Sequence, residues 1–332
     1  MPTGVSPLDA VLADGSVTEV LLNGPGRAFV ERGGRLEPLA LDLDEAGLRA
    51  VVERVIAPLG LRLDRSSPMV DARLPDGSRL HAVMAPVAVE GTCVAIRRFG
   101  APCLPLSGFG LPPDPSRFLE WAVGAGWNLL LAGGTGTGKT TLLNSLSAAV
   151  PTGERIVTVE ETAELRLAQP HVIRLEARPA NAEGAGAISV RDLVRAALRL
   201  RPDRLIVGEV RGGEAFDLLC ALNTGHDGSL CTLHANGPAE ALSRLETLVA
   251  LAGMSLPVEA IRAQIRASVD GVVHLARRSD GSRAVEAIAE VGGADGSPPV
   301  RLLFRGGAGL GVFPQRPARR HDVLPWAREW FG

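Results

Sequence analysis

One run of eight residues constrains this chain more than any other feature. The pattern G-x-x-x-x-G-K-[ST] is matched at every position by Gly133, Gly134, Thr135, Gly136, Thr137, Gly138, Lys139 and Thr140. Apolar residues 127–132 before the run predict a buried strand, and residues 139–150 predict a helix. In that context the glycines let backbone N–H groups face phosphate oxygens at a helix N-terminus. The sequence therefore predicts a loop that binds nucleotide phosphates.

Within this loop, each polar side chain has an expected partner, and the expected ligands are ATP and Mg²⁺. The Lys139 ammonium suits the β- and γ-phosphates, the Thr140 hydroxyl suits Mg²⁺, and Thr141 is placed for the α-phosphate. Lys139 is also the one lysine among 35 basic residues, the other 34 being arginines. Arginine can replace lysine in surface ion pairs, but a broad guanidinium does not fit a narrow phosphate loop. We therefore expect Lys139 to be an active-site residue.

Composition excludes several other classes of protein. The chain is 46% hydrophobic and 22% charged with a net charge of −2, which is typical of a globular protein and not of a polycation that coats nucleic acid. We expect no membrane span, because no uninterrupted apolar stretch approaches the required length, and no signal peptide in residues 1–18. The four cysteines lack C-x-x-C spacing, which favours ordinary thiols in a reducing compartment. The expected location is cytoplasmic.

The pattern of apolar and turn residues divides the chain into four segments. Residues 1–100 alternate short strand signals with one amphipathic helix at 43–59, which predicts a small α+β domain. Residues 101–115 hold five prolines and predict an extended, semi-rigid linker. Residues 116–295 alternate strands and helices, which predicts an α/β domain whose parallel sheet is covered on both faces.

The fourth segment, residues 296–332, is rich in glycine, proline and arginine. This composition favours a loosely ordered tail. The alternative is a segment that docks on a partner through Trp326, Trp330 and Phe331, because aromatic residues are enriched at interfaces.

Carboxylates follow two further predicted strands of the α/β domain. Strand 204–207 is followed by Gly208, where an aspartate ordinarily binds Mg²⁺, and then by Glu209. We expect Glu209 to orient the attacking water and to approach the metal through water. Strand 156–159 is followed by Glu160 and Glu161, which would face the ligand crevice at the carboxyl edge of the sheet and bind Mg²⁺ through water.

Two histidines bracket another predicted strand. His226 precedes strand 230–233 and His234 follows it. A lone histidine is usually structural. Two histidines at the ends of one strand in a P-loop domain favour a functional role instead. We expect His234 to sense the γ-phosphate or to lie at a subunit interface, and His226 to contact the nucleotide.

Four motifs in this order resemble the type II/type IV secretion ATPase family, and within it the branch that drives Flp (tight-adherence) pilus assembly. The resemblance spans about residues 16–292 and rests on GGTGTGKTTLLNSLS, IVTVEETAEL, RPDRLIVGEVRGGEA and NTGHDGSLCTLHAN. It implies a Walker A loop at 133–141, an acidic box at Glu160 and Glu161, an atypical Walker B segment at 205–209 and a histidine box at His226 and His234. The acidic box usually reads Glu-Asp, so Glu161 is a departure.

The resemblance further implies a RecA-like P-loop NTPase domain, with ATP bound between the subunits of a homohexameric ring. It implies an N-terminal domain that rocks on the linker, and inner-membrane platform proteins as partners, with peripheral association at the inner face of the membrane. The near-neutral charge and the lack of a stripe of aromatic and basic residues argue against direct nucleic-acid contact. Arg97 and Arg98 are candidates for reaching phosphates in trans. Arg174, Arg178 and Arg211 are weaker candidates for interface contacts.

Three alternatives stay open at this level. A RecA-like nucleic-acid translocase would show turnover stimulated by DNA or RNA. A non-catalytic, nucleotide-gated scaffold would show no turnover with Mg·ATP. A small-molecule kinase would release a phosphorylated product in place of free phosphate, although the sequence contains no recognisable acceptor motif.

Overall fold

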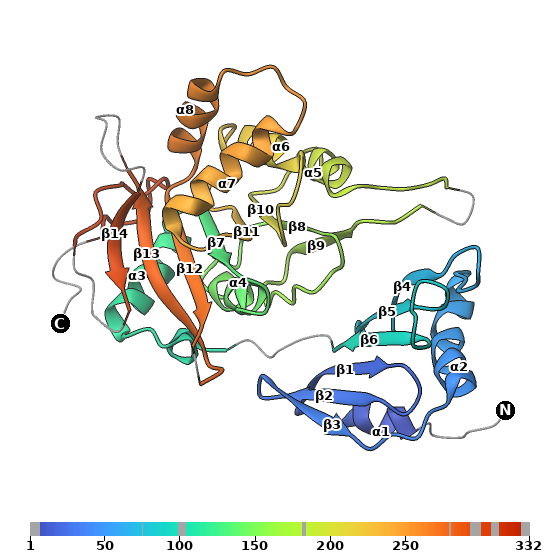
Figure 1. Ribbon diagram of the computed structural model, residues 1–332. Helices are drawn as coiled ribbons and strands as arrows, with labels where there is room; N and C mark the ends of the chain where they lie inside the picture. Colours follow the sequence, from blue (N-terminus) through green and yellow to red (C-terminus); the bar gives the residue numbers. More distant parts are fainter. Residues whose placement is uncertain are drawn as a thin grey trace. The chain divides into compact units, whose positions relative to one another are not determined.

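The computed structural model describes residues 7–74, 76–98, 104–180, 184–278, 280–292, 300–306 and 312–326. The chain divides into two compact units, each described by itself below. The first consists of Met1–Gly100 with Ala180–Gly186, and the second of Ala101–Pro179 with Ala187–Gly332. Figure 1 labels their helices and strands. No helix in these parts of the chain has the length and apolar character that crossing a bilayer requires.

The N-terminal unit is a six-stranded sheet with two helices, α1 (Pro7–Ala13) and α2 (Glu45–Ile56). The sheet has the order β3-β2-β1-β6-β5-β4. Its strands are β1 (Val17–Asn23), β2 (Ala28–Arg32), β3 (Arg35–Leu39), β4 (Met69–Arg73), β5 (Arg79–Val83) and β6 (Cys93–Arg97). Helix α2 begins where the Asp44 side chain accepts a hydrogen bond from the Gly47 N–H, and Leu48, Val52 and Ile56 on its apolar face enter the core.

The second unit is built on an eight-stranded sheet of order β14-β13-β12-β7-β11-β10-β8-β9. The strands are β7 (Leu129–Gly133), β8 (Ile156–Glu160), β9 (Val172–Glu176), β10 (Arg204–Val207), β11 (Leu230–Leu233), β12 (Gly271–Arg277), β13 (Arg283–Val291) and β14 (Val300–Arg305). The six strands from β12 to β9 run parallel, and β13 and β14 extend the sheet in antiparallel fashion. The expected α/β domain with a parallel sheet is therefore confirmed.

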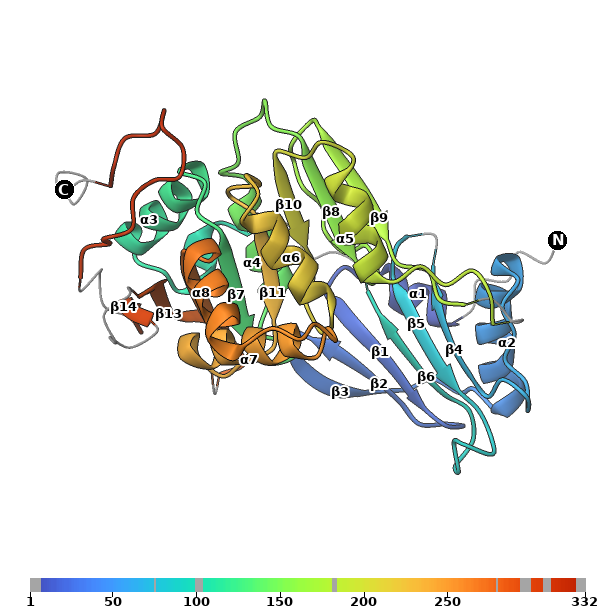
Figure 2. The same cartoon turned by 90° about the horizontal axis from the view of Figure 1, so that it is seen from above.

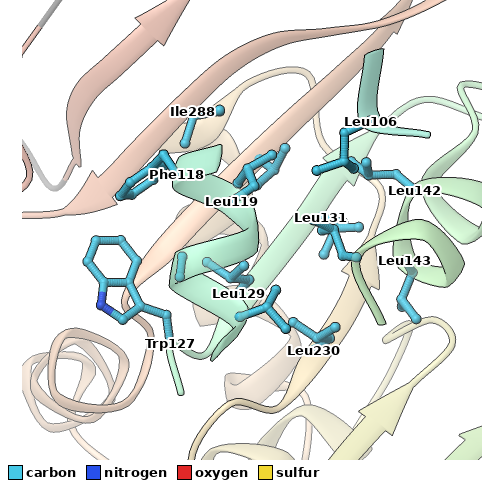
Figure 3. Packing of buried hydrophobic residues seen from close by; sticks show 14 of the residues in the cluster. Leu106, Phe118, Leu119, Trp127, Leu129, Leu131, Leu142, Leu143, Leu230 and Ile288 are labelled. Atoms are coloured by element: carbon cyan, nitrogen blue, oxygen red, sulfur yellow. The ribbon is translucent and has the colours of Figure 1, made fainter. Parts of the chain in front are cut away.

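Helices cover both faces of this sheet (Figure 2). Alternate residues of the strands belong to the two cores on opposite faces. One core holds α3 (Pro113–Gly124) and α4 (Lys139–Ser147) against residues such as Leu129 and Leu131, with Trp127 and Phe118 at one end (Figure 3). The other core holds α5 (Val190–Leu198), α6 (Glu214–Leu222), α7 (Pro238–Ala250) and α8 (Val258–Ser268).

The predicted linker differs from the structure in its second half. A short 3-10 helix, η2 (Leu106–Phe109), buries Leu106 and Phe109 in the core of the second unit, and Leu111 follows them. Helix α3 then begins at Pro113, a residue type favoured in the first turn of a helix. Residues 104–115 therefore belong to the second unit, and burial of Leu106, Phe109 and Leu111 in its core outweighs the extended preference of the prolines.

The interpretation of residues 296–332 as a loosely ordered tail is wrong for the described part. Residues 300–305 form β14, and residues 312–326, which we call the C-terminal strap, pack on the second unit. Trp121 Nε1 donates to the Leu324 carbonyl at 2.9 Å, and Trp127 Nε1 donates to the Pro317 carbonyl at 3.0 Å. Trp326 is buried against Phe118. Trp330 and Phe331 lie outside the described residues, as does Cys103.

Candidate active site

The phosphate loop connects β7 to α4 as the sequence predicts. Two glycines are required by the local backbone: Gly138 has a φ of +92°, and a Cβ at Gly133 would lie 2.5 Å from the Leu275 carbonyl oxygen. The buried Lys139 ammonium donates to the carbonyls of Gly133 at 3.0 Å and Gly134 at 2.8 Å. These bonds hold the cation inside the loop.

The threonines of the loop occupy distinct positions. Thr135 is exposed, whereas the Thr137 hydroxyl donates to the Gly134 carbonyl at 2.9 Å and so braces the loop from within. Thr140 and Thr141 lie in the first turn of α4, where backbone N–H groups lack helical partners. Their predicted contacts to Mg²⁺ and to the α-phosphate stay predictions.

The topology brings the other predicted site residues to this loop. Strands β7, β8, β10 and β11 are parallel neighbours, so their carboxyl ends meet at one edge of the sheet. The phosphate loop follows β7, Glu160 ends β8, and Glu209 lies two residues beyond β10. His234 follows β11 directly. The Lys139 charge acts on both Glu209 and His234, which places these side chains in one electrostatic environment.

Glu160 lies directly beside Gly208 on the next strand. The register pairs Val159 with Val207, and a Cβ built on Gly208 would lie 2.9 Å from the Glu160 Cγ. Glu160 alternates with Val159 along β8, so it shares the sheet face of Ile156, the face on which α4 packs. The Glu160 side chain therefore fills the space that a side chain at position 208 would need.

The buried Glu160 carboxyl has one satisfied and one unsatisfied oxygen. Oε1 accepts hydrogen bonds from the N–H groups of Glu164 at 2.8 Å and Leu165 at 2.9 Å. Oε2 makes no hydrogen bond to any described residue. Burial raises the pKa of Glu160 to about 7, although the two N–H donors oppose this rise.

An unsatisfied buried carboxyl oxygen at this edge fits a nearby metal hydration shell. Mg²⁺ usually keeps several waters and takes only one or two carboxylates from the protein. The described residues contain no group of three or more His, Cys, Asp or Glu side chains arranged to bind a metal directly. Thr140 and Glu160 thus fit an ion held mainly by phosphates and water, with Glu209 near it.

Glu209 is held between two cationic or polar side chains. Its Oε2 accepts a hydrogen bond from Arg211 Nη2 at 2.9 Å, and its Oε1 lies 2.8 Å from His234 Nε2 without hydrogen-bond alignment. Burial raises the pKa of Glu209, but Arg211, His234 and Lys139 outweigh burial and leave the pKa below its usual value. Burial and the Lys139 charge lower the pKa of His234, which favours neutral imidazole.

Glu161 is separated from Glu160 by the alternation of side chains. Its carboxylate is exposed and accepts a hydrogen bond from Arg211 Nη1 at 2.7 Å. Arg211 thus bridges Glu209 and Glu161 within one chain. The predicted role of Glu161 at the metal stays a prediction.

The structure does not bring His226 to the phosphate loop. His226 precedes β11, so it lies at the opposite end of that strand from His234. Its Nδ1 lies 3.1 Å from the Ala221 carbonyl, at the end of α6. A nucleotide at the phosphate loop of the same chain would be out of its reach, because a four-residue strand spans more than about 10 Å.

The two candidate trans arginines belong to the N-terminal unit. Arg97 is exposed at the end of β6, where the register places it between Glu19 and Arg79. Arg98 is half-buried, and its Nη1 donates to the carbonyls of Asp14 and, at 3.2 Å, Val17. Arg98 therefore stabilises its own unit. That either arginine reaches a nucleotide stays a prediction.

Two polar residues that sequence reasoning missed shape the segment around Glu209. The Glu214 Oε1 accepts hydrogen bonds from the N–H groups of Arg211 at 2.6 Å and Gly212 at 2.8 Å. The Thr232 hydroxyl donates to the Gly208 carbonyl at 2.6 Å from the neighbouring strand. Glu214 could have been found from the sequence, because it is an acid at the start of a helix preceded by glycines. The contact of Thr232 with Gly208 could not, because it depends on the order of the strands in the sheet.

A phosphate loop at the carboxyl edge of a parallel sheet, with the buried Glu160 and the half-buried Glu209 at the ends of two further strands, is the arrangement of a P-loop NTPase. A family model described as "Type II/IV secretion system protein" matches residues 3–298. The chain belongs to that family, and it is an ATPase.

Three relatives illustrate the membership. The chain is 39% identical over 333 residues to a putative conjugal transfer protein of Mycobacterium tuberculosis (strain H37Rv), covering 97% of this chain and 93% of the relative. It is 37% identical to the type IV secretion system protein PtlH of Bordetella pertussis, covering 85% and 91%. It is 34% identical to the conjugal transfer protein TrbB of Rhizobium radiobacter, covering 85% and 86%. The closer assignment to the Flp pilus branch stays a prediction.

Two solved structures show the same fold. The Legionella pneumophila ATPase DotB aligns with a TM-score of 0.62 at 20% identity, covering 88% of this chain and 82% of that chain. The pilus retraction motor PilT with bound ADP aligns with a TM-score of 0.61 at 21% identity, covering 86% and 82%. The RecA-like assignment with a separate N-terminal unit is thereby confirmed.

Proposed function

We propose that this chain hydrolyses Mg·ATP as one subunit of a homohexameric ring that powers type II/IV secretion or pilus assembly. The observation that carries the proposal is the convergence of Lys139, Glu209 and His234 at one sheet edge, with Glu160 beside Gly208. Family membership and the conjugal-transfer and type IV secretion relatives support the secretion role.

In this proposal each side chain has a defined task. Lys139 leaves the two loop carbonyls and donates to the β- and γ-phosphates, while the loop N–H groups hold the same oxygens. Glu209, ionised because cations surround it, accepts a hydrogen bond from the attacking water and orients it toward the γ-phosphorus. Neutral His234 contacts Glu209 and is placed to respond to the γ-phosphate.

A magnesium ion, when bound, neutralises charge on the transferring phosphate. Thr140 and, through water, Glu160 and Glu209 would hold it. Position 208 is glycine, where an aspartate often binds Mg²⁺. The Glu160 carboxyl from the adjacent strand occupies the same space.

The remaining parts of the proposal concern partners. We expect inner-membrane platform proteins to anchor the ring, with the chain peripheral at the cytoplasmic face. An arginine such as Arg97 from a neighbouring subunit would complete the phosphate site. Any cation supplied across the interface must be an arginine, because the chain has a single lysine and Lys139 is already placed.

Turnover tests the catalytic part of the proposal. Glu209→Gln keeps the shape of the side chain but removes its charge, and should lower kcat by at least about 100-fold while nucleotide binding persists. Glu259→Gln, an exposed position on α8, is the matched control and should behave as the parent. Turnover by Glu209→Gln at the parental rate would overturn the assignment.

Mass measurements test the assembly part. Light scattering of Glu209→Gln with Mg·ATP should give six times the subunit mass, and the monomer mass under all nucleotide conditions would contradict the ring.

DNA or RNA should leave parental turnover unchanged, and strong stimulation would favour the nucleic-acid translocase. A phosphorylated small molecule in place of free phosphate would favour the kinase.

A further inference from the structure

Arg211 joins Glu209 to a second acid, Glu161. Its Nη2 donates to Glu209 at 2.9 Å and its Nη1 donates to Glu161 at 2.7 Å. A guanidinium has several N–H donors in a planar fork, so one arginine can hold two separate carboxylates at once. Both bonds are within one chain, although Arg211 was predicted as an interface contact.

The main chain at Arg211 is also anchored. Its N–H donates to Glu214, a buried acid at the start of α6, and Gly212 N–H donates to the same oxygen. The Arg211 backbone is therefore held in place beside Glu209, and its guanidinium lies between Glu209 and Glu161. The contact with Glu161 occupies Nη1 and leaves Nη2 directed at Glu209.

This anchoring matters because Glu209 has few other constraints. The residue follows the end of β10, and its Oε1 faces His234 without an aligned hydrogen bond. The Arg211 bond to Oε2 therefore selects the orientation of the carboxylate. A general base must lie within hydrogen-bond distance of the water it orients, so this orientation affects the chemical step.

The Arg211–Glu161 pair is poorly suited to a purely structural role. Their side chains are 57% and 59% exposed, and ion pairs this exposed contribute little to stability. Glu161 accepts from Nη1 while Glu209 accepts from Nη2, so the pair acts on the orientation of the guanidinium, which does not require burial.

We propose that Arg211 is a positioning residue for Glu209, and that Glu161 acts on hydrolysis by anchoring Arg211 and not by approaching the metal. This inference rests on the proposed function, since it presumes that Glu209 orients the attacking water. In this inference Glu161, the second residue of the acidic box, influences Glu209 through its contact with Arg211.

Steady-state kinetics of single and double variants test the inference. Arg211→Ala should lower kcat about 10- to 100-fold, the scale of a misplaced catalytic group, with the nucleotide Kd changed less than about twofold. Arg211→Lys keeps the charge but cannot contact both carboxylates, so its kcat should lie between those of the parent and Arg211→Ala. Glu161→Gln should lower kcat less than Arg211→Ala, and should have no further effect in the Arg211→Ala background.

The matched control is Arg262 on α8, which likewise bridges two carboxylates, the half-buried Glu246 on α7 and the exposed Glu259 on α8. Arg262→Ala should leave kcat, KM and Kd at parental values. Thermal unfolding of each variant reports whether it is folded, and saturable nucleotide binding confirms an intact phosphate loop. A folded Arg211→Ala with the kcat of Arg262→Ala would overturn the inference.

Two further results would also overturn it. If Glu161→Gln raises the Mg²⁺ concentration for half-maximal turnover in both the parent and the Arg211→Ala background, Glu161 acts at the metal. If mixing Arg211→Ala with Glu209→Gln subunits restores turnover, Arg211 acts across an interface, because a residue acting in cis cannot be complemented. A fully active Glu209→Gln would instead refute the proposed function itself.

Discussion

Glu160 and Gly208 share one space on adjacent parallel strands, with the Glu160 Cγ 2.9 Å from where a Cβ at position 208 would lie. The two positions are therefore coupled, and a side chain at 208 must displace the Glu160 carboxyl. An aspartate at position 208 would therefore need the space that the Glu160 side chain occupies.

Gly208→Ala should be destabilising and should slow turnover. The new Cβ forces the buried Glu160 side chain to move, and overpacking of this kind typically costs about 1–3 kcal/mol. Urea unfolding and steady-state turnover measure the two effects. Gly124→Ala is the control, because Gly124 lies in α3 with nothing within 4 Å of an added Cβ, and there alanine is a better helix former. Equal free energies of unfolding for Gly208→Ala and Gly124→Ala would show that position 208 and the Glu160 side chain do not share one space.

An amine-directed reagent should modify a single lysine, and nucleotide should protect it. Lys139 is buried and bonded to two loop carbonyls, so its modification will be slow in the folded protein and fast in urea. Mg·ADP at 100 times its Kd leaves about 1% of sites free, so the rate should fall roughly 100-fold. Peptide mass spectrometry after timed labelling measures the rate. Labelling that nucleotide leaves unchanged would remove Lys139 from the phosphate site.

Cys231 should resist alkylation at neutral and mildly alkaline pH. Burial raises the pKa of this β11 thiol to about 12, so at pH 8 only about one molecule in 10,000 carries the reactive thiolate. The half-buried Cys93 should be alkylated first, and the rate at Cys231 should rise with pH toward 12 until the protein unfolds. Iodoacetamide labelling followed by peptide mapping tests this order. Equal rates at Cys231 and Cys93 would show that β11 is not enclosed.

Removing one arginine from the C-terminal strap should destabilise the second unit. Arg319 pairs with the buried Asp270 and, at 3.0 Å, with Asp227, and Arg316 shares Asp270 with it. Arg319→Ala leaves a buried acid undercompensated, which costs about 3 kcal/mol by comparison with other buried pairs. Arg262→Ala, in a pair at the surface, should cost less than about 1 kcal/mol. Urea unfolding compares the two variants. Similar losses in the free energy of unfolding would show that the C-terminal strap does not stabilise the second unit through Arg319.

Much of the fold and site can be predicted because the signals are local. The phosphate loop is a contiguous run whose glycines, lysine and threonine act through their own backbone and the helix that follows. Parallel strand order then brings Glu160, Glu209 and His234 to the same edge, since all three come at the carboxyl ends of strands. The histidine box implied by the resemblance predicts His226 at the nucleotide, but His226 lies at the opposite end of β11 from His234, away from this edge.

The sequence by itself determined that the chain binds nucleotide phosphates, that a parallel sheet supports the loop, and which acids follow its strands. Only the tertiary structure decided which charges meet. Arg211 reaches Glu161 across 50 residues, and Arg319 reaches Asp270 across 49. Glu160 fills the space beside Gly208 because β8 and β10 are neighbours in register. The physical reason is that periodicity and turn chemistry act over a few residues, whereas the partner of a buried charge is set by strand order and packing.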